Sequence, residues 1–316
     1  MGKHHEALQF LLLGFYLFFG LGGYGLLDNN EGLYAEVARE MLDTKSFIIP
    51  QLNGVPYLEK PPLLYWLVAL MFSIFGQTEF AARLVPVLAG AAVLLSLIWL
   101  GNRTGKKQTG QLAAFILGTT AGFVGLSRVL LFDMVLAAFL SWALALLFAH
   151  LTSGGLKYLL WSYFFLALAV LTKGLVAIVL YYPVAVSFLR FTGRPVLRGM
   201  TRVFHPAALA LFIAVAAPWH ILAAAENRDF AAFYFVNEHL LRFFNLREPH
   251  DYYTGPWYYY LPRLAAGMFP WTILLPLLAL RSKDGGQEKN DLGRYLWIWF
   301  LAPLLFFSIC RAKANY

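Results

Sequence analysis

Three acidic residues of this chain stand where a carboxylate could take part in chemistry. Asp28 and Glu31 follow the first apolar run, and their spacing fits either a helix N-cap closed by a capping box or a general base at a membrane edge. Asp133 lies between two apolar runs, where an acid is functional by default. Its alternative role is a salt bridge to Arg128 across a tight turn. All three carboxylates are therefore candidate catalytic groups.

Two lysines occupy positions that suit a phosphate. Lys60 follows Glu59 and precedes two prolines that stiffen the entry to an apolar run, and Lys173 is a lone cation between two apolar runs. A lysine binds phosphate as a compact point charge. The alternatives are a solvated pair of Glu59 with Lys60, and a snorkelling hairpin tip at Lys173.

A histidine and a group of aromatic residues follow later in the chain. His239, next to Glu238, lies in a predicted interfacial helix over 230–244 and is either a metal ligand or an ordinary interfacial residue. Residues 251–260 include five tyrosines and a tryptophan, which is typical of an aromatic belt. The sequence has no Walker loop, dinucleotide-binding glycine fingerprint, paired-cysteine motif or HExxH helix. We therefore expect substrates from the membrane or the outer compartment.

The composition indicates what kind of protein must position these residues. Of 316 residues, 60% are hydrophobic and only 13% are charged, whereas a soluble domain carries about 25% charged residues. The apolar residues recur in runs that can cross a bilayer, which predicts an all-α, polytopic transmembrane protein. The net charge of +8 does not indicate nucleic-acid binding, because the basic residues separate the apolar runs as topology signals. Cys310 is the only cysteine, so no intrachain disulfide can form.

The apolar runs predict about nine spans. They cover residues 8–27, 84–101, 112–127, 134–151, 158–172, 174–189, 206–225, 264–280 and 295–310. If the shorter run 62–76 lies on the surface, the basic loops 102–110, 190–205 and 281–294 share one side with the N-terminus, as the positive-inside rule favours. We therefore expect a cytoplasmic N-terminus, interfacial helices in the first and fourth outer loops, and the candidate residues at the outer face.

Several strings of this sequence resemble one family of enzymes. They are Glu31…Tyr34-Ala35-Glu36…Ala38-Arg39-Glu40-Met41-Leu42, Pro56-Tyr57-Leu58-Glu59-Lys60-Pro61-Pro62-Leu63-Leu64-Tyr65-Trp66, Phe132-Asp133, Thr172-Lys173-Gly174, Ala217-Pro218-Trp219, Glu238-His239 and Phe269-Pro270-Trp271. Together they look like the aminoarabinose lipid A transferases, which belong with the protein O-mannosyltransferases among membrane-embedded (GT-C) glycosyltransferases that use polyprenyl phosphate. The resemblance runs through essentially the whole chain.

The resemblance implies roles for individual residues. The family carries a catalytic acid in its first outer loop, for which Asp28 and Glu31 are the candidates because Asn30 stands where many relatives have Asp. The second family acid corresponds to Asp133. On the donor side, the resemblance places Lys60 and Lys173 at the carrier phosphate, and we add Arg128, Tyr34 and Tyr57. Glu59 and His239 correspond to positions that can hold a divalent metal ion, the one cofactor expected.

We therefore expect an inverting glycosyltransferase that moves a sugar from a polyprenyl-phosphate carrier such as undecaprenyl phosphate. Its acceptor is expected to be a lipid A-like glycolipid or another extracytoplasmic acceptor, a protein included. The lysines and Arg128 would stabilise the departing phosphate, and Asp28 is the favoured base. The alternatives are a sugar-lipid transporter and a non-catalytic membrane scaffold.

The expected organisation is one module over residues 1–316 in a bacterial inner membrane, with its active site facing the periplasm. Residues 28–80 form the first outer loop with two interfacial helices, and residues 226–262 form a later outer loop. Relatives are expected to continue beyond Tyr316 into further spans and a C-terminal outer domain that this sequence lacks.

Overall fold

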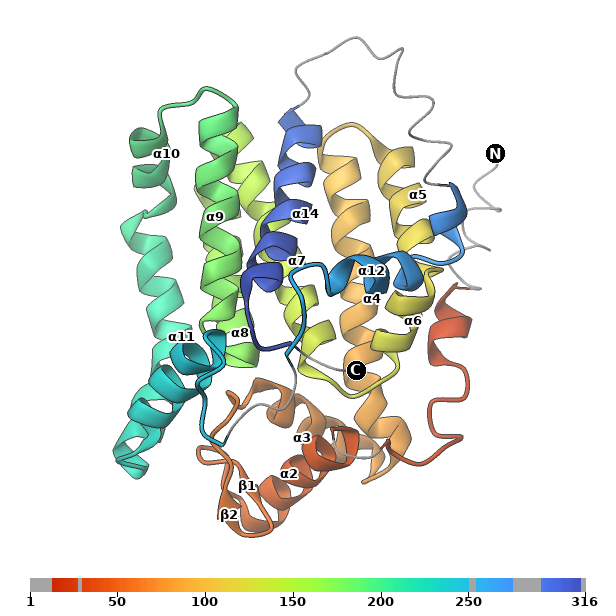
Figure 1. Ribbon diagram of the computed structural model, residues 1–316, viewed down its shortest axis with the longest axis vertical. Coiled ribbons are helices and arrows are strands. Elements are labelled where there is room, and N and C mark those ends of the chain that lie inside the picture. Colours follow the sequence, from red (N-terminus) through yellow and green to blue (C-terminus); the bar gives the residue numbers. More distant parts are fainter. Residues whose placement is uncertain (1–12, 28–29, 250–253, 275–290, 314–316) are drawn as a thin grey trace.

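The computed structural model describes residues 13–27, 30–249, 254–274 and 291–313. This part of the chain is predominantly helical, and its long helices stand side by side in a bundle (Figure 1). The elements in chain order are α2 (Glu31–Thr44), β1 (Gln51–Leu52), β2 (Val55–Pro56), α3 (Leu63–Phe75), α4 (Glu79–Arg103), α5 (Lys107–Gly118), α6 (Ala121–Ser127), α7 (Phe132–Ser153), α8 (Leu156–Lys173), α9 (Val176–Phe191), α10 (Val196–Val203), α11 (Pro206–Glu226), the π-helix η1 (Ala232–Leu241), α12 (Tyr260–Gly267), the 3-10 helix η2 (Trp271–Leu274) and α14 (Asp291–Ile309).

Five helices of the described chain are long and apolar enough to cross a membrane, namely α4, α7, α8, α11 and α14. The pair α5 and α6 would add one more candidate, although the two helices meet at 73°. These helices coincide with predicted spans, so the chain is a polytopic helical membrane protein, as predicted. The total of about nine spans stays a prediction, because residues 1–12 and 275–290 lie outside the described chain.

Three predicted spans are not continuous helices where the structure describes them. The described part of 8–27 is helical only as far as Phe18, and 112–127 is divided between α5 and α6. The third is the span over 264–280, where α12 ends at Gly267 and a turn through Pro270 leads into η2. Proline has no amide hydrogen and its ring clashes with the preceding helical turn, so a helix does not continue smoothly through Pro270. The prediction of one unbroken span is therefore wrong for residues 264–274, and residues 275–280 lie outside the described chain.

The helices α2 and α3 and a two-stranded hairpin occupy one end of the bundle (Figure 1). The sequence predicted both helices, and their position at a membrane surface stays a prediction. It did not predict the hairpin, although Asn53-Gly54 at its turn was an available signal. Both residues have positive φ, 54° and 76°, as the type I′ turn of a two-residue hairpin requires.

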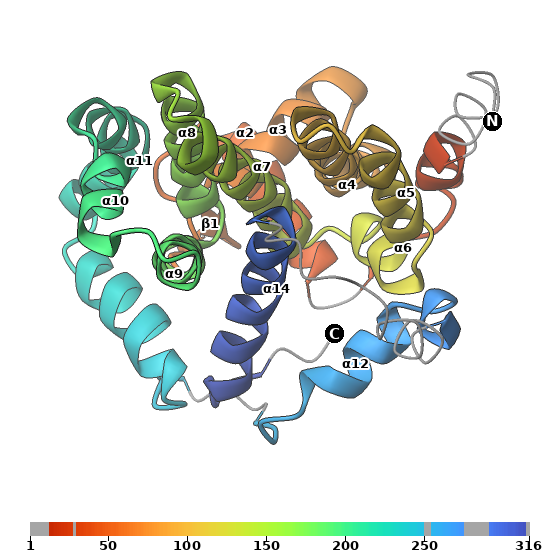
Figure 2. The ribbon, with the colours of Figure 1, turned by 90° about the horizontal axis from the view of Figure 1, so that it is seen from above.

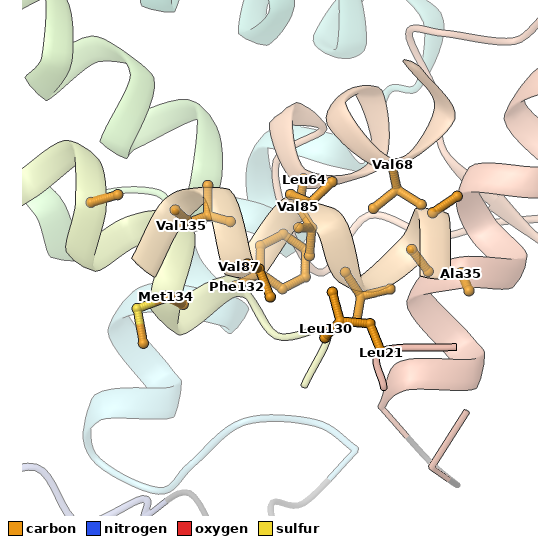
Figure 3. Close-up of a cluster of buried hydrophobic side chains, with 14 of the residues drawn as sticks. Leu21, Ala35, Leu64, Val68, Val85, Val87, Leu130, Phe132, Met134 and Val135 are labelled. Atoms are coloured by element: carbon orange, nitrogen blue, oxygen red, sulfur yellow. The ribbon is translucent and has the colours of Figure 1, made fainter. Parts of the chain in front are cut away.

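The central helix α7 fixes the end of the bundle to which α2 and α3 are attached. Figure 2 shows α7 between α8 and α4, and it packs against both. Its first turn, with Phe132 and Val135, joins a buried cluster that includes Ala35 of α2 and Leu64 of α3 (Figure 3). Asp133 is therefore anchored by apolar neighbours and held at a defined place relative to the first loop.

Candidate active site

The acid and the lysine predicted between apolar runs form an ion pair. Asp133 is in the first turn of α7 and Lys173 is the last residue of α8, and Lys173 Nζ lies 2.6 Å from Asp133 Oδ1. Each charge is at the helix end that the helix dipole favours, the carboxylate at an N-terminus and the ammonium at a C-terminus. Both side chains are partly exposed, so a ligand can reach them. The sequence treated the two residues separately, and the structure brings them together.

Lys60 forms a second charged cluster with Glu238 of η1. Its Nζ lies 3.2 Å from Glu238 Oε2 and donates to the Glu59 carbonyl at 3.0 Å. Burial lowers the pKa of Lys60, the carboxylate of Glu238 opposes that shift, and the positive charges of Arg242 and Lys173 add to it. Lys60 is therefore a largely buried cation that is held by a carboxylate from a distant part of the chain.

Two arginines that the sequence did not suggest complete this second cluster. Arg242 lies 3.2 Å from Glu238 Oε2, and Arg247 forms an ion pair with the other oxygen of Glu238. Arg247 also pairs with Glu59 at 2.8 Å. Burial by itself raises the pKa of Glu238, but Lys60 and the two arginines hold it below its ordinary value. The four-residue spacing of Glu238 and Arg242 was a sequence signal, whereas nothing in the sequence pointed to Arg247.

His239 joins the two clusters through the turn after α8. Its Nε2 accepts the Leu175 amide hydrogen at 3.0 Å, and its Nδ1 donates to the Tyr234 carbonyl at 2.6 Å. Gly174 allows this approach, because a Cβ there would lie 2.2 Å from His239 Nε2. The π-helical segment η1 is thereby seated directly on the turn that follows Lys173.

The geometry does not fit the predicted metal site. Both ring nitrogens of His239 are engaged by the backbone, so its lone pair is not available to an ion. Glu59 is bound by Arg247 and by the Tyr57 hydroxyl. In the described part of the chain, no three His, Cys, Asp or Glu side chains are grouped to hold a metal. We therefore derive no step that uses a metal at Glu59 and His239.

Two further predicted site residues have other partners. Glu31 is fully buried and bound by Arg83 and by the backbone, so its carboxylate is not placed to act as a catalytic acid. The guanidinium of Arg128 donates to the carbonyls of Tyr16 and Phe19, so this side chain holds the N-terminal segment in place. The contact between Arg128 and the carrier phosphate stays a prediction. Asp28 lies outside the described residues, and its predicted role as the base is untested.

The predicted tyrosines connect the first loop to the acid of α7. Tyr34 packs edge-on against Phe132, with ring centroids 4.8 Å apart. The Tyr57 hydroxyl donates to Glu59 Oε2 at 3.3 Å, and its ring packs against Tyr65. Burial raises the pKa of Tyr57, so its hydroxyl remains a hydrogen-bond donor. These contacts place the first loop beside the Asp133 pair.

An apolar cavity of about 240 Å³ lies between α3, α4, α7 and α8. Val135, which lines it, is two residues beyond Asp133, and Leu67 lines it on the helix that begins just after Lys60. The remaining lining residues are Met71, Val85, Leu88, Ala89, Ala92, Ala138, Phe139, Trp142 and Phe165. An apolar chain is the natural occupant, because such a cavity offers almost no hydrogen-bonding partners.

Taken together, cations outnumber carboxylates in the described site. The cations are Lys60, Lys173, Arg242 and Arg247, and the carboxylates are Glu59, Asp133 and Glu238. Cations in a partly dry site stabilise an anion more strongly than they do in water. Together with the apolar cavity between α3, α4, α7 and α8, these charges suit a ligand that has a phosphate head and a hydrocarbon tail.

The chain is similar to known membrane glycosyltransferases. Residues 59–223, just over half of the chain, match the family profile of dolichyl-phosphate-mannose-protein mannosyltransferases. The chain is 34% identical, over 93% of its length, to an undecaprenyl phosphate-alpha-4-amino-4-deoxy-L-arabinose arabinosyl transferase from Pectobacterium atrosepticum. It is 31% identical, over 98% of its length, to the enzyme with that name from Pseudomonas aeruginosa.

A solved structure shares the fold. The crystal structure of ArnT from Cupriavidus metallidurans bound to undecaprenyl phosphate aligns with 99% of this chain, with a TM-score of 0.87 and 25% identity. The chain covers 57% of that protein, and 52% and 56% of the two bacterial relatives. The chain thus spans about half the length of the relatives it matches.

Proposed function

The chain belongs to the dolichyl-phosphate-mannose-protein mannosyltransferase family, and from this premise we propose that it is a membrane glycosyltransferase with a polyprenyl-phosphate sugar donor. The proposal is carried by the ion pairs that hold Lys60 and Lys173, together with an apolar cavity whose walls include Leu67 of α3 and Val135 of α7. The bacterial relatives are named for an undecaprenyl-phosphate sugar, and the related crystal structure contains undecaprenyl phosphate. We assign the same class of donor to this chain.

In the proposed complex, the phosphate of the carrier lies between Lys60 and Lys173, and part of the isoprenoid tail enters the apolar cavity. The acceptor oxygen attacks the anomeric carbon of the sugar while the bond from that carbon to the phosphate oxygen breaks. The phosphate leaves with the bonding electrons, and the two ammonium groups stabilise its added charge. A hydroxyl acceptor passes its proton to a carboxylate, for which Asp28 stays the predicted base. A single displacement inverts the anomeric configuration.

Asp133 orients Lys173 in this mechanism. Without a carboxylate 2.6 Å from its Nζ, the lysine has a flexible stem and no fixed direction. The pair therefore keeps a cation at the position where the phosphate charge develops. An acceptor that carries a phosphate would arrive already ionised and would depend less on a base.

We assign the acceptor to the class of lipid A-like glycolipids, on the family resemblance of the motifs. We also place the chain in a bacterial inner membrane with the site at the periplasmic face and the N-terminus in the cytoplasm. The positions of α10 and of the connection between α4 and α5, both rich in Lys and Arg, support this orientation, because they lie at the end of the bundle opposite α2 and α3 (Figure 1). The clustering of site charges at one end of the bundle also favours a transferase over a transporter with a site at mid-membrane.

A transfer assay tests the proposal. The purified chain in liposomes receives an undecaprenyl-phosphate sugar with a radiolabelled sugar, together with a lipid A-like glycolipid, and both lipids are then separated. We expect label on the glycolipid with inverted anomeric configuration. Asp133→Asn should slow transfer at least about a hundredfold, whereas Asp291→Asn, in an ion pair at the other end of the bundle, should not. Label that stays on the carrier, or crosses the bilayer still attached to it, contradicts the proposal.

A further inference from the structure

A fully buried ion pair lies close to the proposed site without taking part in the proposed chemistry. Glu31 of α2 and Arg83 of α4 are both 0% exposed. Arg83 binds both carboxylate oxygens, with Nη2 2.8 Å from Oε2 and Nε 3.1 Å from Oε1. Such a pair loses much of its Coulomb energy to desolvation, and apolar residues of similar volume often stabilise a fold equally well. The pair therefore calls for an explanation other than net stability.

The carboxylate of Glu31 also accepts two backbone hydrogen bonds from different segments. The Leu27 amide donates to Oε2 at 2.8 Å, and the Leu130 amide donates to Oε1 at 2.8 Å. Leu130 belongs to the connection between α6 and α7, three residues before Asp133. One side chain of α2 thus holds the backbone just ahead of the acid that pairs with Lys173.

Arg83 uses its remaining donors on the end of the N-terminal segment. Its Nη1 donates to the carbonyls of Leu21 and Tyr24, and its Nη2 donates to the carbonyl of Gly25, each at 2.8 Å. The guanidinium also lies over the Tyr24 ring, 3.8 Å from its centroid. Only a planar side chain with several fixed donors meets all of these partners at once.

We infer that Glu31 and Arg83 are a positioning pair that sets the place of Asp133 relative to the first loop. The pair joins four segments, namely the N-terminal segment, α2, α4 and the connection into α7. The next contacts along that connection, Phe132 against Tyr34 and Tyr65, extend the same attachment. The effect of the pair on catalysis rests on the proposed function, since Asp133 acts there through Lys173. The attachment of the Leu130 backbone to α2 and α4 does not depend on that function.

The test replaces the pair by apolar residues of similar size, Glu31→Leu with Arg83→Met. This variant avoids an unpaired buried charge, so the fold should survive. Amide hydrogen exchange is measured across the chain in detergent. We expect exchange over residues 128–133 to become about fivefold to tenfold faster, because the Leu130 amide loses its acceptor, while exchange in α8 and α9 stays unchanged. The matched control is Arg194→Met with Asp291→Leu, which removes an ion pair at the opposite end and should leave residues 128–133 as they were.

The possible results separate a positioning role from a merely structural one. Exchange at the wild-type rate over 128–133 in the apolar variant overturns the inference. A uniform increase across the whole chain also overturns it, because it would mean that the pair stabilises the entire fold and not this segment in particular. If the double variant does not fold, Arg83→Lys keeps the charge but removes the forked donors that fix the Glu31 carboxylate against the Leu130 amide. Exchange should then rise over the same residues by a smaller factor, and unchanged exchange would overturn the inference. In a transfer assay, the apolar variant should lose at least about tenfold in kcat with little change in KM. Failure of the wild-type chain to transfer sugar would refute the proposed function, and the exchange result would still decide the positioning role.

Discussion

Replacing Gly174 with alanine should damage the fold and the site together. Gly174 has φ 82° and ψ −151°, a backbone region used almost only by glycine, and another residue there costs about 1–3 kcal/mol. The added Cβ would also lie 2.2 Å from His239 Nε2 and 2.6 Å from the Tyr234 hydroxyl. An ordinary contact begins at 3.4 Å, so His239 must retreat by at least 1.2 Å, which breaks its hydrogen bond with the Leu175 amide.

The size of the effect follows from these two losses. A buried amide left without its acceptor costs about 1–3 kcal/mol, so Gly174→Ala should lose about 2–6 kcal/mol in all, a large share of the 5–15 kcal/mol that is typical of a folded domain. The displacement of η1 should also carry Glu238 away from Lys60. We therefore expect both a lower unfolding midpoint and weaker binding of undecaprenyl phosphate.

Gly154→Ala is the matched control for this prediction. Gly154 also has positive φ, 77°, but a Cβ there meets nothing within 4 Å, and it lies at the far end of α8. The control should lose only about 1–2 kcal/mol and keep full affinity for the carrier. Denaturant midpoints and carrier binding are measured for both variants in the same detergent. Equal losses of stability with unchanged binding in both variants would refute the reasoning about His239.

Three further predictions concern the charges and the cavity of the site. Lys173→Ala should weaken undecaprenyl-phosphate binding about tenfold to a hundredfold, since a hydrogen bond to a charged group contributes about 1.5–3 kcal/mol, whereas Lys157→Ala at the other end of the same helix should leave the dissociation constant unchanged. The pKa of Glu238 is lowered from 4.5 in the folded state, so its contribution to stability is present above pH 4.5 and is lost as the pH falls through the lowered value. Glu238→Gln should therefore flatten the acid side of a plot of the unfolding midpoint against pH. An unchanged plot would contradict this prediction. Ala89→Phe should fill the apolar cavity and reduce the affinity for undecaprenyl phosphate without altering competition by inorganic phosphate, as measured by displacement of a labelled carrier.

The sequence predicted the parts of this protein that depend on local pattern. Long apolar runs predicted the bundle helices, and the two short helices at its end followed from periodicity and length. Lys60, Asp133 and Lys173 stood out because a charge beside an apolar run is rare. Proline was the local signal that was misjudged, since the turn through Pro270 interrupts a run that looked long enough to span.

The pairing of the charges could not be predicted, because partners come from distant parts of the chain. Lys60 meets Glu238 across 178 residues, and Glu31 meets Arg83 across 52. Glu31 therefore looked like a catalytic acid when its buried partner was unknown. Arg247 had no distinguishing feature, since an arginine in a polar loop is ordinary until the fold places it beside two glutamates.

The most direct test of the central claim is an experimental structure of this chain with undecaprenyl phosphate bound. We predict the phosphate within hydrogen-bonding distance of Lys60 and Lys173, with the adjoining isoprenoid units directed toward the cavity lined by Leu67 and Val135. A phosphate bound at the opposite end of the bundle, beside α10, would contradict the proposed site.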